Sequence, residues 1–196
     1  MKIIKCEQGS PEWYVIKCGI PSASNFDKIV TTKGTPSKQR TKYLYKLAGE
    51  KIAGVTEENY QNATMARGSE MEPEARRLYE IAKDVEVEQV GFCISGDYGA
   101  SPDGLVGEHG LVEIKCPIAS THVGYLLKDV VPTDYYQQLQ GQLLVTGRQW
   151  VDFVSYYPGI KPLIIRVDRE DKFIDYLEAE LVGFCAELNQ IVKEIL

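Results

Sequence analysis

The order in which helix-like and strand-like segments follow one another is the feature that most limits what this chain can fold into. Residues 10–54 carry mainly helical signals, residues 85–116 mainly strand signals, and residues 133–195 indicate one helix, two strands and a last helix. This irregular interleaving favours an α/β domain with a central mixed sheet flanked by helices. The strict alternation of a doubly wound nucleotide-binding fold is absent, as are the GxGxxG and GxxxxGK[ST] phosphate loops.

Local signals set the expected bounds of the elements. Ser10 before Pro11 predicts a helix start, and Gly54 and Gly147 are expected to end helices. A further helix ends at about residue 83, and it begins either at the capping box of residues 69–72 or near Asn62, with a kink at the following proline. The expected strands cover residues 2–6, 85–94, 111–116, 149–157 and 162–168, with a turn at 104–110, and the other expected helices follow residue 22 and cover 38–53, 133–145 and 171–195.

Composition excludes several classes of protein. Apolar residues make up 44% of the 196 residues, which suits a single soluble globular domain spanning residues 1–196 and argues against disorder. No apolar run is long enough to span a bilayer and the start does not resemble a signal peptide, so we expect a cytoplasmic protein. The five cysteines include no CxxC pair, which leaves no pattern for a zinc or iron–sulfur site.

The charges are unevenly distributed along the chain. The net charge is −6, yet residues 28–51 contain seven basic residues against one acid, and residues 168–196 contain eight acids against three bases. Such a distribution can mark one side that faces nucleic acid, with Arg40, Lys42 and Lys46 as candidate phosphate contacts. An ordinary solvated helix face explains the same charges, and both interpretations stay open at this point.

Three charged residues suggest a hydrolytic centre. Glu113 and Lys115 are two positions apart on a predicted strand, so their side chains leave the same face of the sheet. Asp103, in the preceding Ser-Pro-Asp-Gly turn, would add a second carboxylate. Oxygen ligands of this kind suit Mg²⁺ or Mn²⁺, and a metal ion beside a lysine suits phosphodiester hydrolysis. The alternative is a turn aspartate beside an unrelated ion pair at a strand edge.

Two further features support that centre. Glu72 falls on an otherwise apolar helical stripe, where an unpaired carboxylate would be costly unless a metal ion neutralised it; a capping box from Ser69 is the alternative. Residues 137–142 contain four glutamines on a predicted helix. Amides on a helix are usually solvated, but here they could hold a water molecule or a phosphate oxygen.

Together these motifs resemble the phage lambda exonuclease (YqaJ-type) family of the PD-(D/E)xK nuclease superfamily. The similarity also includes residues 9–13, 17–24 and 67–75, and extends over about residues 7–157. It implies a restriction-endonuclease-like core and Mg²⁺-dependent 5′-to-3′ digestion of linear duplex DNA, which leaves 3′ single strands for recombination. It further implies two metal ions per site, with Mn²⁺ as a possible substitute, a homotrimeric ring around DNA ends, a single-strand annealing protein as partner, and a phage or prophage gene in a bacterial host.

The resemblance also implies a role for individual residues. Lys115 would activate the nucleophile, assisted by Gln138, while Lys17 and Ser24 would bind a 5′-phosphate. The implied metal ligands are Glu72, Asp103, Glu113 and the main-chain carbonyl of Ile114. The family has an arginine where this chain has Lys17, which is a point charge in place of a bidentate fork.

Three alternatives to these assignments stay open. Lys17 could be a surface charge while Ser22 or Ser24 only caps a helix. At the level of the whole protein, an endonuclease of the same superfamily and a DNA-binding module without catalysis are the other interpretations.

Overall fold

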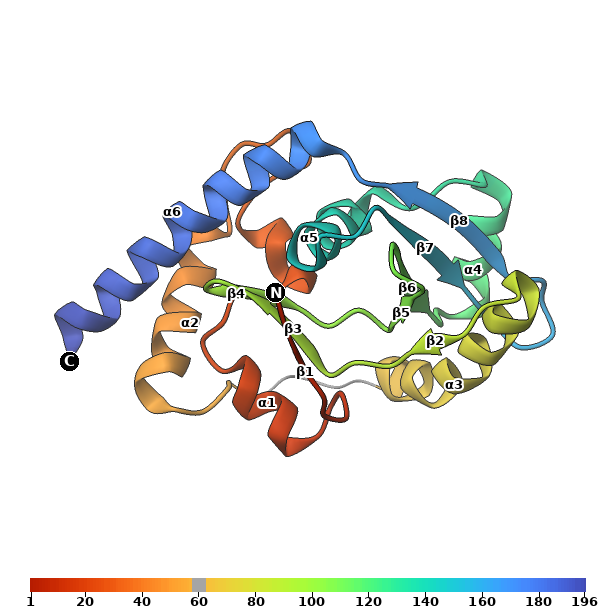
Figure 1. Ribbon diagram of the computed structural model, residues 1–196, viewed down its shortest axis with the longest axis horizontal. Coiled ribbons are helices and arrows are strands. Elements are labelled where there is room, and N and C mark those ends of the chain that lie inside the picture. Colours follow the sequence, from red (N-terminus) through yellow and green to blue (C-terminus); the bar gives the residue numbers. More distant parts are fainter. Residues whose placement is uncertain (58–62) are drawn as a thin grey trace.

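The computed structural model describes residues 1–57 and 63–196, with side chains for residues 1–57 and 66–196. Within these residues two sheets are present (Figure 1). A five-stranded mixed sheet has the order β2-β5-β6-β7-β8, and a three-stranded antiparallel sheet has the order β1-β3-β4. In the larger sheet only β6 and β7 run parallel. The predicted central mixed sheet flanked by helices is therefore confirmed.

The elements have the following bounds. The strands are β1 (Lys2–Ile4), β2 (Val87–Glu88), β3 (Phe92–Ser95), β4 (Tyr98–Ala100), β5 (Gly104–Val106), β6 (Gly110–Lys115), β7 (Trp150–Ser155) and β8 (Leu163–Asp168). The helices are α1 (Pro11–Lys17), α2 (Arg40–Ala53), α3 (Ala63–Lys83), α4 (Ala119–Lys128), α5 (Tyr136–Thr146) and α6 (Asp171–Ile195), and the short 3₁₀ helices are η1 (Ala23–Lys28) and η2 (Thr133–Tyr135).

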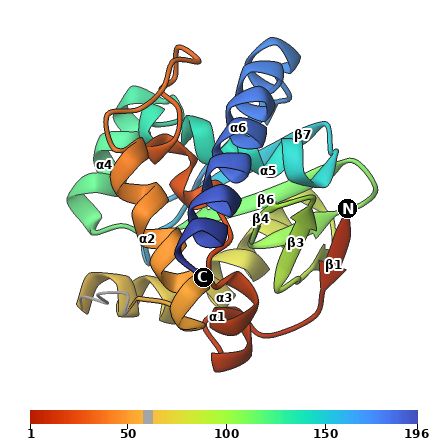
Figure 2. The ribbon, with the colours of Figure 1, turned by 90° about the vertical axis from the view of Figure 1, so that its left-hand side faces the viewer.

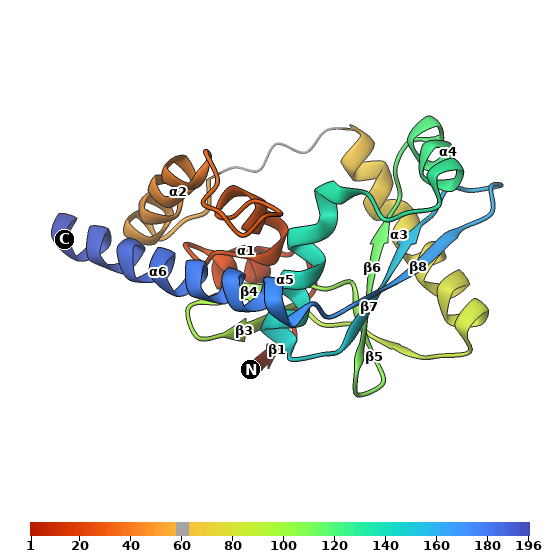
Figure 3. The same cartoon turned by 90° about the horizontal axis from the view of Figure 1, so that it is seen from above.

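Helices cover both faces of the five-stranded sheet (Figure 3). On one face, Ala75 and Tyr79 of α3 pack on a small apolar cluster that includes Val112 of β6. On the other face, α5 and η1 enclose the larger core, which also receives α2 and α6. Figure 2 shows α6 beside α2, on the side of the molecule away from α3. Strand β6 is thus buried on both faces.

Several local signals predict element bounds correctly. The Ser10 hydroxyl accepts a hydrogen bond from the Trp13 amide (3.3 Å) and caps α1, which has Pro11 at its first position. Gly54 and Gly147 end α2 and α5 in the left-handed conformation, at φ 70° and 69°. Glycine adopts this conformation without strain, so its position predicts a helix end well.

The start of α3 differs from the prediction based on the capping box. The helix begins at Ala63 and continues through Pro73, so Ser69 lies inside it. The second predicted start, Asn62, lies outside the described residues. An internal proline removes one helical hydrogen bond. The buried contact of Tyr79 with the sheet supports the helix on the far side of that proline.

Other differences concern segments without strong local signals. Residues 85–94 form β2 and β3, which belong to different sheets, and residues 104–106 form β5 instead of part of a turn. Helix α4 is absent from the prediction, because it has neither a polar N-cap nor a glycine at its end: Ile118 precedes it and Asp129 follows it. The helix expected over residues 133–145 begins later, since Thr133 lies in η2 and α5 starts at Tyr136. In the described part of the chain, no helix has the length and apolarity needed to cross a membrane.

Helix α5 lies very close to η1. Gly141 of α5 faces Phe26 of η1, and a Cβ atom at Gly141 would lie 2.4 Å from the Phe26 ring. Phe26 is fully buried. The absence of a side chain at Gly141 therefore sets the distance between the two helices, and with it the position of the residues that η1 carries.

Candidate functional site

The alternation along β6 directs Glu113 and Lys115 toward α5. Val112 and Ile114 point to the α3 side, where they join the small cluster. Glu113 is buried, and its Oε1 lies 2.5 Å from Lys115 Nζ. The prediction that the two side chains share one face is therefore confirmed.

Two amides of α5 contact the same carboxylate. Gln138 Nε2 donates to Oε1 of Glu113 (2.5 Å), and Gln142 Nε2 donates to Oε2 (2.6 Å). Gln142 was predicted only as one of four glutamines that could hold a water molecule or a phosphate oxygen, whereas Gln138 was predicted individually as a site residue. The spacing could have identified Gln142, because residues four apart lie on the same face of a helix.

Asp103 lies next to this carboxylate, immediately before β5. Its Oδ2 accepts a hydrogen bond from the Ile114 amide (2.6 Å). The following residue, Gly104, has no room for a side chain, because a Cβ atom would lie 2.0 Å from Val87 Cγ1. This close approach of β5 to β2 positions the Asp103 carboxylate beside β6.

Glu72 has a partner that the sequence did not predict. It forms an ion pair with Arg76, one helical turn away on α3, and its side chain is one third exposed. A metal ion is therefore not needed to pair this carboxylate, because Arg76 pairs with it, and the ligand role of Glu72 stays a prediction. Burial nevertheless raises the pKa of Glu72, against the effect of Arg76, and the nearby charge of Glu113 raises it further.

Mutual repulsion among the acids characterises this site. Burial raises the pKa of Asp103 well above its usual range, and the charges of Glu113 and Glu72 add to the effect. For Lys115, burial alone would lower the pKa, but Glu113 and Asp103 together raise it above its ordinary value. Oxygen donors that repel one another in a buried site suit a hard divalent cation such as Mg²⁺.

A small cavity joins these residues to the predicted phosphate-binding residues. Its volume is about 190 Å³, and we call it the central cavity. It is lined by Gln8, Trp13, Lys17, Ala23, Ser24, Ser101, Asp103, Glu113, Lys115, Gln138 and Gln142. Residues predicted for hydrolysis and residues predicted for 5′-phosphate binding thus line one space.

Glu72 lines a second cavity that adjoins the first. This cavity has a volume of about 830 Å³ and shares Gln8, Trp13 and Asp103 with the central cavity. Within the described residues, no three His, Cys, Asp or Glu side chains lie together in a group that could hold a metal ion. Asp103 and Glu113 are the carboxylates that line the central cavity, whereas Glu72 lines the adjoining one, with one of its carboxylate oxygens paired with Arg76.

Lys17 lies above the aromatic ring of Trp13, and both residues line the central cavity. Its Nζ is 3.6 Å from the centroid of the Trp13 ring, and the indole N–H of Trp13 donates to Gly91 O and to Ser101 Oγ. Burial lowers the pKa of Lys17 to about 8, against the opposing charge of Glu50. Lys17 is therefore not an ordinary surface charge.

The hydroxyl groups of the predicted phosphate pocket are also free of capping roles. Ser24 is exposed at the start of η1, and its Oγ lies 3.3 Å from Ser22 Oγ. Ser22 precedes η1 but makes no side-chain capping bond. The structure therefore does not support the alternative in which Ser22 caps this helix.

The predicted phosphate contacts of α2 lie outside the central cavity. Arg40 forms an ion pair with Glu187 of α6 (2.6 Å), and Lys46 forms one with the buried Glu50 (2.6 Å). Lys42 is exposed, lacks an ion pair within the described residues, and lines a separate cavity of about 430 Å³.

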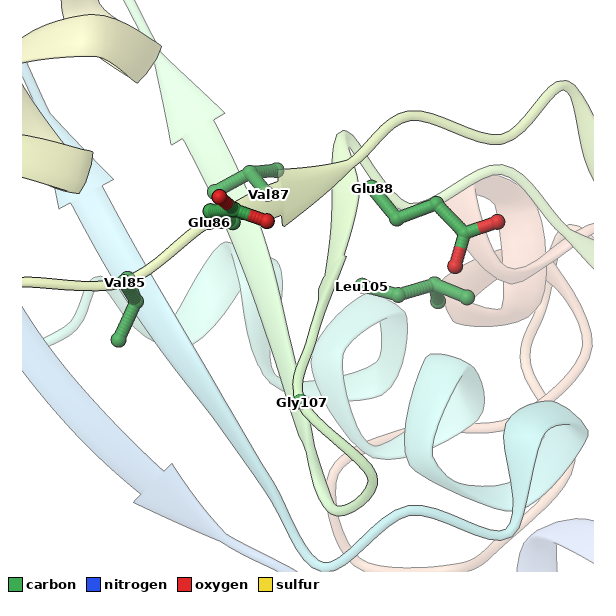
Figure 4. Close-up of a pocket in the computed structure, with 6 residues that line it drawn as sticks. All are labelled: Val85, Glu86, Val87, Glu88, Leu105 and Gly107. Atoms are coloured by element: carbon green, nitrogen blue, oxygen red, sulfur yellow. The ribbon is translucent and has the colours of Figure 1, made fainter.

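A further cavity lies at the edge strand β2 and has a volume of about 520 Å³ (Figure 4). Its lining includes Glu86, Glu88 and Leu105, and it contains none of the predicted site residues. The residues predicted for hydrolysis and for 5′-phosphate binding therefore line the central cavity and the cavity that adjoins it.

Comparisons with known proteins agree with this geometry. The family model of the YqaJ-like viral recombinase domain matches residues 12–149. An alkaline exonuclease from Laribacter hongkongensis, also solved in complex with dAMP, is 35% identical over 95% of this chain and 96% of its own, with a TM-score of 0.86. A phage-related exonuclease from Haemophilus somnus shares the fold, with a TM-score of 0.72 and 14% identity over 90% of this chain and 96% of its own. No protein with a curated description matches the chain.

Proposed function

The chain belongs to the YqaJ-like viral recombinase family, and from this premise we propose that it is a Mg²⁺-dependent exonuclease. It would digest linear double-stranded DNA from 5′ ends and leave 3′ single strands for recombination. The observation that carries the proposal is the central cavity, which is lined by Lys17 and Ser24 together with Asp103, Glu113 and Lys115. A group that can hold a terminal phosphate thus lies beside a group suited to phosphodiester hydrolysis.

We propose that the site binds two Mg²⁺ ions, for which Mn²⁺ can substitute. The ligands would be the carboxylates of Asp103, Glu113 and Glu72 and the main-chain carbonyl of Ile114. When bound, the cation would supply an activated water molecule and positive charge for the phosphate oxygens.

The side chains around Glu113 have complementary roles in the proposed reaction. Lys115 places its ammonium group beside the Glu113 carboxylate, where it can stabilise charge that develops on the phosphate. Gln138 donates to the same carboxylate oxygen and holds Glu113 in place. Both contacts come from residues that line the central cavity, so they act where the scissile phosphate would lie.

The lining of the central cavity supports an exonuclease over an endonuclease. Lys17 and Ser24, which suit a terminal 5′-phosphate, line the same space as Asp103, Glu113 and Lys115. A group that binds a strand end beside the hydrolytic residues is expected of an enzyme that starts at 5′ ends, and it supports the proposed 5′-to-3′ polarity.

The proposal extends to the assembly and its setting. We infer from the family a homotrimeric ring that encloses duplex DNA, a single-strand annealing protein as partner, and action in the cytoplasm of a bacterial host.

One incubation tests the proposed function. End-labelled linear duplex and covalently closed circular duplex are incubated with the protein, with and without Mg²⁺. We expect release of 5′ mononucleotides from the linear duplex only, and only with Mg²⁺. Cleavage of the circle would favour the endonuclease alternative, and binding without any hydrolysis would favour the module without catalysis.

A further inference from the structure

The amide of Gln142 occupies a position in the site that differs from that of Gln138. Oε1 of Glu113 accepts hydrogen bonds from both Lys115 and Gln138, whereas for Oε2 the described residues supply only the bond from Gln142. A carboxylate oxygen has two lone pairs. Oε2 therefore keeps one lone pair for a cation or a water molecule, and the bond from Gln142 determines where that lone pair points.

Gln142 also has an unused acceptor. Its side-chain carbonyl oxygen is buried and has no hydrogen-bond partner among the described residues. A buried acceptor without a partner is unfavourable, and native proteins contain few of them. Because Gln142 lines the central cavity, a water molecule or a bound ligand in that cavity can supply the missing donor.

We propose that Gln142 is a positioning residue of the hydrolytic site, which orients Glu113 Oε2 for cation binding through its NH₂ group and holds a water molecule through its carbonyl oxygen. This inference rests on the proposed function, because it assigns a role within the same site. Gln142 acts through Glu113 and not on the DNA itself.

Gln140 provides a matched control on the same helix. Gln140 and Gln142 are equally buried, at 1% exposure each. Gln140 donates to Asp168 O and accepts from the Glu170 amide, so it ties α5 to the connection between β8 and α6. Replacement of either glutamine removes a buried amide from α5, but only one of the two contacts the site.

The experiment compares Gln142→Met and Gln140→Met by calorimetric titration of the DNA-free protein with Mn²⁺. Methionine has a similar length and no amide, so it keeps the volume and removes the hydrogen bonds. We expect Gln142→Met to weaken Mn²⁺ binding by about 10- to 100-fold, the range found when a partner of a metal ligand is removed. Gln140→Met should stay within about twofold of the wild type. Thermal unfolding without metal verifies that both variants are folded.

The outcomes separate this inference from the proposed function. If the wild type binds Mn²⁺ and hydrolyses duplex ends, but Gln142→Met binds Mn²⁺ as tightly, the inference is wrong and the function stands. If the wild type neither binds Mn²⁺ nor hydrolyses DNA, both are wrong. Should Gln142→Met fail to fold, Gln142→Asn retains a polar amide that is one methylene too short to reach Glu113, and the same loss of affinity is expected relative to Gln140→Asn.

Discussion

Two buried acidic residues on neighbouring strands, Glu113 and Asp152, have different roles. Glu113 of β6 faces α5, whereas Asp152 of β7 faces α3. Asp152 accepts two hydrogen bonds from Arg166 and one from the hydroxyl of the fully buried Tyr79, which is a satisfied structural network. Glu113 instead lines a cavity, close to other carboxylates that it repels. Burial alone therefore does not identify a functional acid.

Replacement of Glu113 is expected to separate activity from folding. Glu113→Gln removes the charge that would hold a cation, so we expect Mg²⁺-dependent hydrolysis to fall at least about 100-fold. Duplex binding in EDTA and cooperative thermal unfolding should persist. A single-turnover assay on a 5′-labelled duplex measures the loss, and near-normal hydrolysis would contradict this assignment of the centre.

Asp152→Asn is the control with the opposite outcome. It weakens the bonds from Arg166 and Tyr79, and because Arg166 is half exposed we expect a loss of only about 1–3 kcal/mol in the free energy of unfolding. Hydrolysis should be retained well below the melting temperature. Urea denaturation gives the loss of stability.

The lowered pKa of Lys17 predicts that the preference for 5′-phosphate ends depends on pH. Because burial holds its pKa at about 8, the ammonium loses its proton as the pH rises through that value. The preference for 5′-phosphate over 5′-hydroxyl ends should therefore decline between about pH 7 and 9.5. In Lys17→Arg the preference should stay constant, because the guanidinium remains charged.

The measurement for Lys17 is a ratio of initial rates on duplexes that differ only in the 5′ group. A ratio cancels the effect of pH on the hydrolytic residues, since both substrates use them equally. A wild-type ratio that does not change with pH, or equals one throughout, would contradict phosphate binding by Lys17.

At the scale of elements, the sequence predicts a helix bound correctly where neighbouring residues alone determine it. Ser10, Gly54 and Gly147 act within one helical turn, and the bounds that they predict agree with the structure. The capping box at Ser69 fails because α3 is held by its contact with the sheet, which lies far away in sequence. The ion pair of Glu72 with Arg76, by contrast, is a local contact four residues apart that helical spacing could have identified. The shared face of Glu113 and Lys115 likewise follows from strand alternation alone.

Helix α5 should tolerate very little at its contact with η1. In Gly141→Ala the new methyl group would collide with the buried ring of Phe26, and we expect a loss of about 1–3 kcal/mol in the free energy of unfolding. Gly183→Ala in α6 is the matched control, because nothing lies within 4 Å of its Cβ position. That variant should gain up to about 1 kcal/mol from helix propensity. Urea denaturation of both variants tests this, and equal effects would contradict the close contact.

At the scale of the whole molecule, ion pairs reduce the basic character of α2. Arg40 and Lys46 are each paired with a glutamate, and Glu187 comes from the acidic C-terminal helix α6. The uneven charge distribution in the sequence is thus partly neutralised where α2 and α6 pack together. Lys42 is the residue of the predicted three that keeps its charge exposed without an ion pair in the described part of the chain.

Salt dependence of DNA binding is expected to distinguish these three residues. Lys42→Ala should lower the slope of log affinity against log salt by about one, because one phosphate contact is lost. Lys46→Ala should lower it less, since Glu50 already neutralises Lys46. Fluorescence anisotropy on a labelled duplex from 50 to 200 mM salt, in EDTA, gives both slopes. An unchanged slope in Lys42→Ala would assign α2 to an ordinary solvated surface.

The contact between Gly141 and Phe26 has a consequence for the products of digestion. Helix α5 carries the amides that hold Glu113, and it also supports η1, which carries Ser24. On the proposed function, the separation between a bound 5′-phosphate and the bond to be cut is therefore fixed by the packing of two helices. Every product should then have the same length, whatever the base sequence of the strand.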